Sequence, residues 1–144
     1  MTGEFAIAVH ALVYLDHKKS YVSSEELAKN VCTNPARIRM VMGRLKKAGI
    51  ITTREGVTGG YAVCCDAAAL SLRAVSDAVQ ARFVGSAWRS GDMDMNCLVA
   101  SGMADVMDGL YAQMDEKCRE HLARMTLKDV SDKIFSCKER PAQA

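Results

Sequence analysis

The sequence predicts a mainly α-helical protein with one small β-hairpin and a long helix near the C-terminus. Two short helical segments with strong capping signals follow each other between residues 23 and 49. Directly after them, the stretch IITTREGVTGGYAV (residues 50–63) places two β-prone runs on either side of a glycine-containing turn. From residue 103 to residue 125, apolar side chains recur every three or four positions, as on one face of a helix. A chain of 144 residues accommodates these elements as one compact domain plus one further helical element.

The N-terminal segment is expected to form a first helix that ends near residues 16–17. Its apolar residues recur at helical spacing and are Phe5, Ala8, Val9, Leu12 and Leu15. A second, short helix is expected to begin after Ser23, because Ser23 and Glu26 form the S-x-x-E capping box. Val22 and Leu27 occupy the hydrophobic staple positions of the same helix start.

A third helix is predicted between Asn34 and Gly49. Asn34 is suited to the N-cap, Pro35 to the first helical position and Gly49 to the C-terminal stop. One face of this helix is apolar and consists of Ile38, Val41, Met42, Leu45 and Ala48. The opposite face carries Ala36, Arg39, Met40, Gly43 and Lys47, with Arg37, Arg44 and Lys46 on its flanks. Two capped helices joined by so short a turn make a helix-turn-helix motif.

The helix-turn-helix and the following hairpin together predict a winged helix-turn-helix, an arrangement that suits DNA. The second helix of such a motif fits the major groove, where arginine can read guanine edges. Phosphates are held by Lys, Arg and helix N-termini, and glycines let the wing turn tightly. For the third helix alone, an ordinary solvated basic face is the alternative. The residues expected to contact double-stranded DNA are Ser23, Ser24, Asn34, Ala36, Arg37, Arg39, Met40, Arg44, Lys47, Arg54 and Thr58.

The C-terminal part is expected to mediate dimerisation. Its apolar stripe consists of Met103, Met107, Leu110, Met114, Cys118 and Leu122. A core within the same chain is the alternative for such a stripe. Thr126 and Asp129 resemble a second capping box and are expected to start a last helix. Four regions are therefore expected: a winged-helix DNA-binding domain (1–83), a linker loop (84–101), dimerisation helices (102–136) and a frayed tail (137–144).

The charges are distributed unevenly along the chain. From residue 18 to residue 54 there are nine Lys or Arg against two Asp or Glu, whereas residues 92 to 135 carry five against nine. This asymmetry is typical of a polyanion-binding head attached to a body with another role. Two solvated faces of one domain are the alternative, and the net charge of +2 by itself indicates no partner.

Several classes of protein are not expected from the sequence. The first apolar segment, around residues 5–15, is too short to span a bilayer and lacks a basic flank, so the chain is expected to be cytoplasmic without a membrane partner. Six cysteines without a C-x-x-C pair indicate reduced thiols rather than a disulfide framework or a zinc site. No nucleophile stands beside a base in a recognisable motif. The chain is therefore not expected to be an enzyme, and no cofactor is expected to bind it.

The stretch VSSEELAKNVCTNPARIRMVMGRLKKAGIITTREGVTGGYAV, followed by LSLRAVSDAV, resembles the Rrf-two family of bacterial winged-helix regulators, which includes IscR, NsrR and CymR. The wing pattern G-x-x-G-G-Y and the preceding R-L-x-K-x-G are fairly specific, and the match runs from the first helix to about residue 81. AVHALVYL and TNP resemble most the cluster-free group related to YwnA. The resemblance implies a sequence-specific regulator, expected to be a repressor. It also implies a homodimer whose long helix crosses its partner and places two winged helices on a palindromic operator.

Two departures from the family pattern change what is expected. Cluster-binding members carry three cysteines close together before the long helix, whereas this chain has only Cys97 there. No iron–sulfur cluster of the usual type is therefore expected; a variant site of His10, Cys97 and Cys118 is the alternative. In the wing, the family's minor-groove arginine aligns with Glu55, and Arg54 is displaced by one residue. The wing is therefore expected to position the protein, while the third helix, with Arg39 and its neighbours, chooses the sequence.

The sequence suggests that DNA binding by this chain is switched by oxidation of its cysteines. Cys32 lies between the two helices of the DNA-binding motif, and Cys97 lies in the loop before the long helix. A disulfide between these residues of two different subunits would reorient the DNA-binding helices; Cys137, near the terminus, is a weaker candidate. The alternatives are cysteines that only fill space, a small-molecule effector in a pocket beneath the long helix, and a winged helix that contacts only protein.

Overall fold

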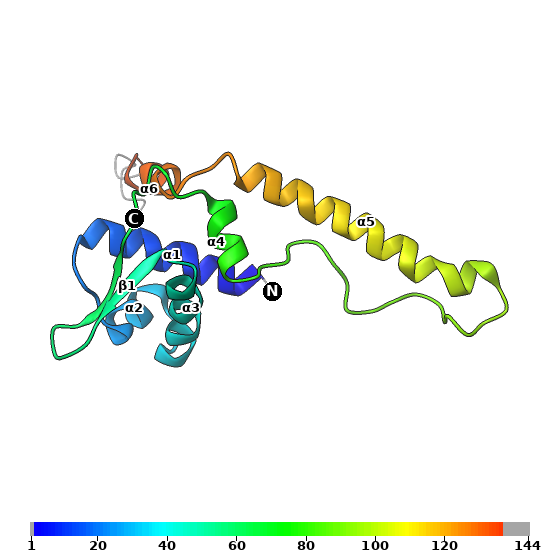
Figure 1. Cartoon of the computed structure of the whole chain (residues 1–144), viewed down its shortest axis with the longest axis horizontal. Coiled ribbons are helices and arrows are strands. Elements are labelled where there is room, and N and C mark those ends of the chain that lie inside the picture. Colours follow the sequence, from blue (N-terminus) through cyan, green and yellow to red (C-terminus); the bar gives the residue numbers. More distant parts are fainter. Residues whose placement is uncertain (1, 137–144) are drawn as a thin grey trace, which may run out of the picture.

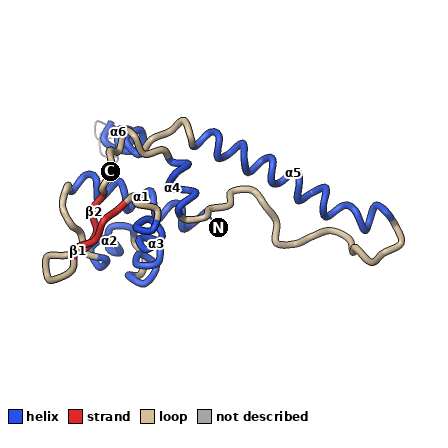
Figure 2. Tube along the Cα trace, viewed as in Figure 1, coloured by secondary structure: helices blue, strands red, loops and turns tan. Residues whose placement is uncertain are grey.

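The computed structural model describes residues 2–136. They form a compact part, called the head (residues 2–83 and 127–136), and one projecting part, called the arm (residues 84–126) (Figures 1 and 2). The elements are α1 (Thr2–Lys18), α2 (Ser24–Val31), α3 (Pro35–Lys47), β1 (Ile51–Arg54), β2 (Gly60–Val63), α4 (Leu72–Ala78), α5 (Leu98–Leu122) and α6 (Leu127–Ser136). The expected mainly α fold with one β-hairpin is confirmed. Among the described residues, no helix is both long and apolar enough to cross a membrane. The expected tail at 137–144, including Cys137, lies outside the described residues.

The core of the head lies between α1, α2, α3 and α4. The apolar stripe of α3 points inward at Ile38, Val41, Met42 and Leu45, which are all fully buried. Ala48, also assigned to this stripe, is exposed instead, because it is the C-cap residue just after the helix. The four buried side chains pack with Leu12 and Leu15 of α1 and with Leu27 of α2. Removing each large side chain from water contributes about 1.5–3 kcal/mol, so this packing decides which face of α3 turns to solvent.

The predicted helix starts are confirmed by their hydrogen bonds. Ser23 Oγ accepts a bond from the main-chain N–H of Glu26 at 3.2 Å, and Asn34 Oδ1 accepts one from that of Arg37 at 2.8 Å. The carboxylate of Glu26 accepts a bond from the hydroxyl of Tyr14 on α1 at 2.7 Å. Each cap satisfies a donor that would otherwise lack a partner, which stabilises the helix start by about 1 kcal/mol.

The hairpin is joined to the head through the residue before α2. Strands β1 and β2 pair antiparallel, with Ile51 opposite Val63 and Arg54 opposite Gly60. Val22 continues the sheet, because its N–H and carbonyl bond the carbonyl and N–H of Tyr61 at 2.9 and 2.8 Å. Gly60 has a φ of +145°, and a Cβ at this position would collide with the carbonyl of Val22. Only glycine therefore lets the wing lie this close to the start of α2.

Helix α6 returns the chain to the head and packs against α1 (Figure 1). Its predicted capping box is confirmed: Thr126 Oγ1 accepts from the N–H of Asp129 at 3.2 Å, and Asp129 Oδ2 accepts from the N–H of Thr126 at 2.9 Å. Leu127 is fully buried, and its N–H donates to the carbonyl of Leu70 at 2.9 Å. These bonds fix the end of the arm to the segment before α4.

Helix α5 begins at Leu98, four residues before the expected boundary at residue 102. The main-chain N–H of Ser101 already bonds the carbonyl of Cys97 at 2.9 Å, which forms the first turn. Leu98 and Val99 are exposed in that turn, so no apolar face marks it in the sequence. The helix therefore extends into the segment that the sequence assigned to the linker.

The C-terminal half of α5 is fixed to the head by polar side chains, of which Asp115, Arg119 and Glu116 bond residues of the head. Asp115 Oδ1 accepts from the N–H groups of Phe83 and Val84 at 2.7 and 3.0 Å. Arg119 Nη1 lies 2.6 Å from Asp77 Oδ1 on α4, and its Nε donates to Asp115. Burial acts to raise the pKa of Asp115, but the bonds from Val84, Phe83 and Arg119 outweigh it and lower that pKa. The N-terminal half of α5 extends away from the head (Figure 1).

Candidate nucleic-acid interface

The outward face of α3 is open to solvent along its length. Its side chains are exposed at the positions predicted from the sequence, which are Ala36, Arg39, Met40, Gly43 and Lys47, and Arg37 on the flank is exposed as well. A Cβ on Gly43 would meet nothing within 4 Å, so no other part of the described chain covers the middle of this face. Small residues at two of these positions allow another molecule to approach the helix backbone closely.

Arg39 lies at the centre of the face and reaches towards the start of α2. Its Nη1 is 3.4 Å from the hydroxyl of Ser24 and 3.9 Å from a carboxylate oxygen of Glu25. The side chain is 55% exposed, so the ion pair with Glu25 is weak and solvent-screened. The guanidinium can leave this pair and bind an anion or a guanine edge at little cost.

Arg44 does not lie on the outward face, which differs from the expectation that it contacts DNA. Its Nη1 binds the carboxylate of Glu4 on α1 and donates to the carbonyl of Val79, after α4, at 3.1 Å. The side chain is only partly exposed, and its charge is compensated inside the head. Arg44 therefore ties one flank of α3 to α1 and to the end of α4, and its charge is paired within the head.

Two further cations near α3 are used within the wing. Arg54, expected to contact DNA, donates from Nη2 to the carbonyl of Thr58 at 2.7 Å, and its guanidinium lies 4.2 Å from the ring centroid of Tyr21. Lys46 donates to the hydroxyl of Thr53 at 2.9 Å. Arg54 thus closes the wing loop, and Lys46 ties the end of α3 to β1. The hydroxyl-bearing side chain of Thr58 stays exposed on the loop.

The tip of the wing carries an apolar residue that the sequence reasoning missed. Val57 is fully exposed between Glu55 and Thr58, next to Gly56, whose φ is +104°. An apolar side chain on a narrow turn is of the kind that proteins place against the minor groove. The sequence does show a β-branched residue beside a glycine. Ordinary turns share this pattern, however, so the pattern alone does not identify a wing tip.

Ser23, Ser24 and Asn34 lie at the N-termini of α2 and α3. The side-chain oxygens of Ser23 and Asn34 accept the capping hydrogen bonds, which leaves the Ser23 O–H and the Asn34 Nδ2 as possible donors. Exposed N–H groups at helix N-termini bind phosphate. The two helix starts, the outward face of α3 and the wing therefore form one surface, which we call the α3–wing surface.

The apolar stripe of α5 is largely uncovered by the part of the chain that the structure describes. Leu110 and Met114 are each 46% exposed and Met103 is 38% exposed, while Met107, Cys118 and Leu122 are half-buried. Val106, which the periodicity did not single out, is also exposed and extends the stripe. Exposed apolar residues aligned along a helix are typical of a surface that another chain covers.

The two candidate redox cysteines lie in different parts of the molecule. Cys32 is exposed in the turn between α2 and α3, in the left-handed conformation with φ of +62°. Cys97 is exposed at the N-cap of α5, at the end of the arm that lies far from the head (Figure 1). Bonds from the main-chain N–H groups of Ala100 and Val99 lower the pKa of the Cys97 thiol. Within one chain these two sulfurs do not meet.

The chain as a whole matches one family of known proteins. The model of the Rrf2 family, described as iron-dependent transcriptional regulators, covers residues 1–133. The chain belongs to the Rrf2 family. YwnA of Bacillus subtilis (strain 168), a candidate HTH-type transcriptional regulator, is 32% identical over 137 residues, which are 94% of this chain and 99% of YwnA. The Rrf2 family is one of regulators rather than enzymes, which confirms the expectation from the sequence.

Two solved structures share the fold of this Rrf2 family chain. A candidate transcriptional regulator from Lactobacillus plantarum is 28% identical, with a TM-score of 0.82 over 94% of this chain and 91% of that one. A candidate DNA-binding protein is 32% identical, with a TM-score of 0.68 over 89% of this chain and 98% of that one. Both structures confirm the winged-helix fold predicted from the sequence.

The described residues do not fit the iron implied by the Rrf2 family description. Among residues 2–136, no three His, Cys, Asp or Glu side chains lie close enough together to hold a metal ion. His10 Nε2 lies 2.8 Å from Asn30 Oδ1 instead. Cys97 and Cys118 stand at the two ends of α5, about 30 Å apart at the usual helical rise of about 1.5 Å per residue. The alternative site of His10, Cys97 and Cys118 is therefore not formed within one chain.

Proposed function

We propose that this Rrf2 family regulator is a sequence-specific DNA-binding protein that acts as a homodimer on a palindromic operator and represses transcription. The observation that carries the proposal is the open face of α3, with Arg39 at its centre and the wing beside it. The similarity to a candidate DNA-binding protein at 32% identity supports it. A dimer that covers its operator would block access to the promoter, which makes repression the simplest outcome.

The residues of the α3–wing surface have different roles in this proposal. Arg39 reads a guanine edge, because its guanidinium is exposed and only weakly paired with Glu25. Arg37 and Lys47 hold phosphates, which gives affinity without sequence preference. The wing, stiffened by Arg54, positions the protein on the duplex through its exposed tip.

The dimer is formed by the stripe of α5 against the same stripe of a second copy. Leu110 and Met114 lie near its middle and lose their exposure to water on pairing. In a two-fold dimer, the two α3 helices would enter successive major grooves on one side of the duplex, about one helical turn or 34 Å apart. An operator with matching two-fold symmetry follows from this arrangement.

The experiment that tests the proposal is selection of bound sequences from random duplex DNA, followed by gel shifts at two salt concentrations. The expected result is an enriched palindrome whose binding weakens steeply as salt rises. Arg39→Ala should relax the preference at one position of each half-site. Leu110→Glu should give monomers in sedimentation and weaken operator binding, whereas Ala112→Glu, also an exposed position of α5, should do neither. Absence of any enriched sequence, with binding insensitive to salt, would favour a module that contacts only protein.

A second candidate function is sensing of oxidants, favoured by the position of Cys97. Its thiol lies at the start of a long helix, where main-chain N–H groups stabilise the thiolate. Diamide can accept two electrons and two protons from Cys97 of one subunit and Cys32 of the other, which leaves a disulfide between them. The test is operator affinity before and after diamide, in the wild type and in Cys32→Ser and Cys97→Ser. Unchanged affinity in the oxidised wild type would exclude this function.

A further inference from the structure

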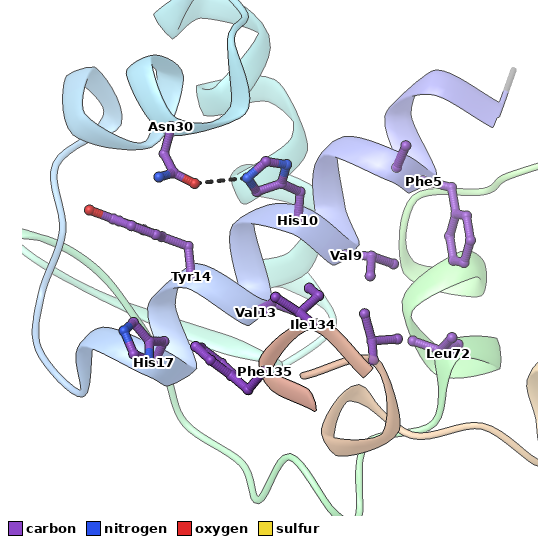
Figure 3. Close-up of a pocket in the computed structure, with 12 residues that line it drawn as sticks. Phe5, Val9, His10, Val13, Tyr14, His17, Asn30, Leu72, Ile134 and Phe135 are labelled. Atoms are coloured by element: carbon purple, nitrogen blue, oxygen red, sulfur yellow. Dashed lines mark hydrogen bonds between the residues drawn. The ribbon is translucent and has the colours of Figure 1, made fainter. Parts of the chain in front are cut away.

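A groove of about 510 Å³ lies on the head, between α1 and α6 (Figure 3). Its walls come mainly from these two helices, with Leu72 of α4 and Asn30 of α2 at its edges. None of the described residues that line it belongs to α3, so the groove is separate from the α3–wing surface. Its volume is in the range of pockets that hold small organic molecules, about 300–1,000 Å³.

The walls of the groove are apolar and rich in aromatic rings. Phe5 stands at one end, and Tyr14, His17 and Phe135 stand towards the other (Figure 3). The rings of His17 and Phe135 lie 4.8 Å apart at an angle of 32°. The described lining residues include no Lys, Arg, Asp or Glu. Such walls favour an uncharged aromatic molecule, which gains from ring–ring contact as well as from leaving water.

One pair of polar side chains interrupts the apolar lining. His10 Nε2 and Asn30 Oδ1 are 2.8 Å apart and point towards each other from α1 and α2 (Figure 3). Each side chain has a second polar nitrogen, Nδ1 of His10 and Nδ2 of Asn30, that this bond does not use. Tyr14 is different, because its hydroxyl already donates its one proton to Glu26 at 2.7 Å. Apart from His17, whose ring packs against Phe135, the polar corner of the groove is therefore the one formed by His10 and Asn30.

We propose that this groove binds a small uncharged aromatic molecule that carries one hydrogen-bonding group, as phenols, naphthols and quinones do. The rings lie between α1 and α6, and the hydroxyl or carbonyl group bonds the corner formed by His10 and Asn30. The site contacts α6, which follows the arm, and also α2, which leads into α3. A bound molecule would thus touch both α6, which follows directly after α5, and the helix-turn-helix. The proposal goes beyond DNA binding and does not depend on it, since ligand binding is measured without DNA.

The first test uses the neutral fluorescent probe N-phenyl-1-naphthylamine with the full chain. We expect saturable enhancement of its fluorescence by the wild type. Ala6 is exposed and lines the groove, so Ala6→Trp fills the groove from its edge without replacing a core residue. This variant should weaken probe binding about tenfold or more, since the bulky ring occupies the space of the ligand. Ala112→Trp, at an exposed position of α5 away from the groove, is the matched control and should leave binding unchanged.

The second test addresses the polar corner by displacing the probe with 2-naphthol or with naphthalene. The wild type should prefer 2-naphthol about fivefold or more, because only this compound can bond the corner. His10→Phe keeps a ring at the position but removes its nitrogens, and should abolish that preference while still binding the probe. Circular dichroism melting of each variant confirms that the helices are intact.

Three outcomes would overturn the proposal. The first is a wild type that does not enhance the probe at all. The second is equal binding by the wild type and Ala6→Trp, which would place the probe elsewhere, for example on the stripe of α5. The third is probe binding that is lost as the protein concentration is raised through dimerisation, because a second copy would then cover the groove.

Discussion

The guanidinium of Arg44 on α3 is bound to the carboxylate of Glu4 on α1, forty residues earlier in the chain. The same guanidinium donates to the carbonyl of Val79. These contacts join α3, α1 and the end of α4 behind the outward face that carries Arg39. The orientation of the α3–wing surface is therefore fixed by an ion pair on the flank of the helix.

Replacing Arg44 by alanine should destabilise the head rather than only weaken DNA binding. We expect Arg44→Ala to lower the free energy of unfolding by about 1–2 kcal/mol, because Glu4 and the carbonyl of Val79 both lose a charged donor. Arg37→Ala, at an exposed position of the same helix, should change it by less than about 0.5 kcal/mol. Urea denaturation at one protein concentration measures both, and equal effects would contradict the role assigned to Arg44.

Two glycines should respond in opposite ways to the same substitution. Gly60→Ala should lower the free energy of unfolding by about 1–3 kcal/mol, since φ is +145° there and the new Cβ collides with Val22. Gly43→Ala should raise it by about 0.5–1 kcal/mol, because Gly43 lies inside α3 with open space around it. Thermal melts compare the two variants directly. A neutral Gly60→Ala would show that the wing can move away from α2.

Lys47 and Arg39 should differ in how their loss changes DNA binding. If Lys47 holds a phosphate, Lys47→Ala weakens binding to all DNA sequences alike. It also reduces, by about one, the slope of the logarithm of the binding constant against the logarithm of the salt concentration. Arg39→Ala should instead reduce the binding free energy by about 1–3 kcal/mol on the selected operator and by much less on random DNA. Arg39→Lys should fail to restore the preference, because an ammonium group cannot bond guanine in bidentate fashion. Fluorescence anisotropy at several salt concentrations separates these effects.

The attachment of α5 should depend on pH through Asp115. Its pKa in the folded chain lies below the ordinary value of 3.8, so the carboxylate stabilises the fold at all pH values above about 4. This contribution is lost as the pH falls through the lower, folded-state pKa. We expect Asp115→Asn to lower the free energy of unfolding by about 1–2 kcal/mol at pH 7, and the difference from the wild type to shrink below pH 4. A difference that stays constant down to pH 3 would contradict this role.

Local signals in the sequence predicted most of the head, because caps, apolar stripes and glycine stops act over a few residues. The roles of Arg37 and Arg44 could not be separated in this way. They are seven residues apart and share almost the same side of α3, but only Arg44 lies beside Glu4 and the end of α4. Which arginine is structural depends on neighbours that are distant in sequence.

The groove between α1 and α6 could not be predicted from the sequence, for a related reason. Phe5 and Ile134 line the same groove but stand near opposite ends of the described chain. The sequence showed His10 only as a lone histidine on an apolar helix, and its pairing with Asn30 depends on the packing of α1 against α2. The start of α5 at Leu98 was missed because its first turn buries no apolar face.

The attachment of α5 at one end gives it the mechanics of a lever. Its pivot is the joint where Arg119 meets Asp77, and its free end is Leu98. Over the intervening length of about 32 Å, a rotation of about 10° at the pivot displaces the free end by about 6 Å. In a dimer built along α5, the distance between the two α3 helices would thus be set by the angle at this joint. Variants of Asp77 or Arg119, far from any base pair, would then alter the half-site spacing that the protein prefers.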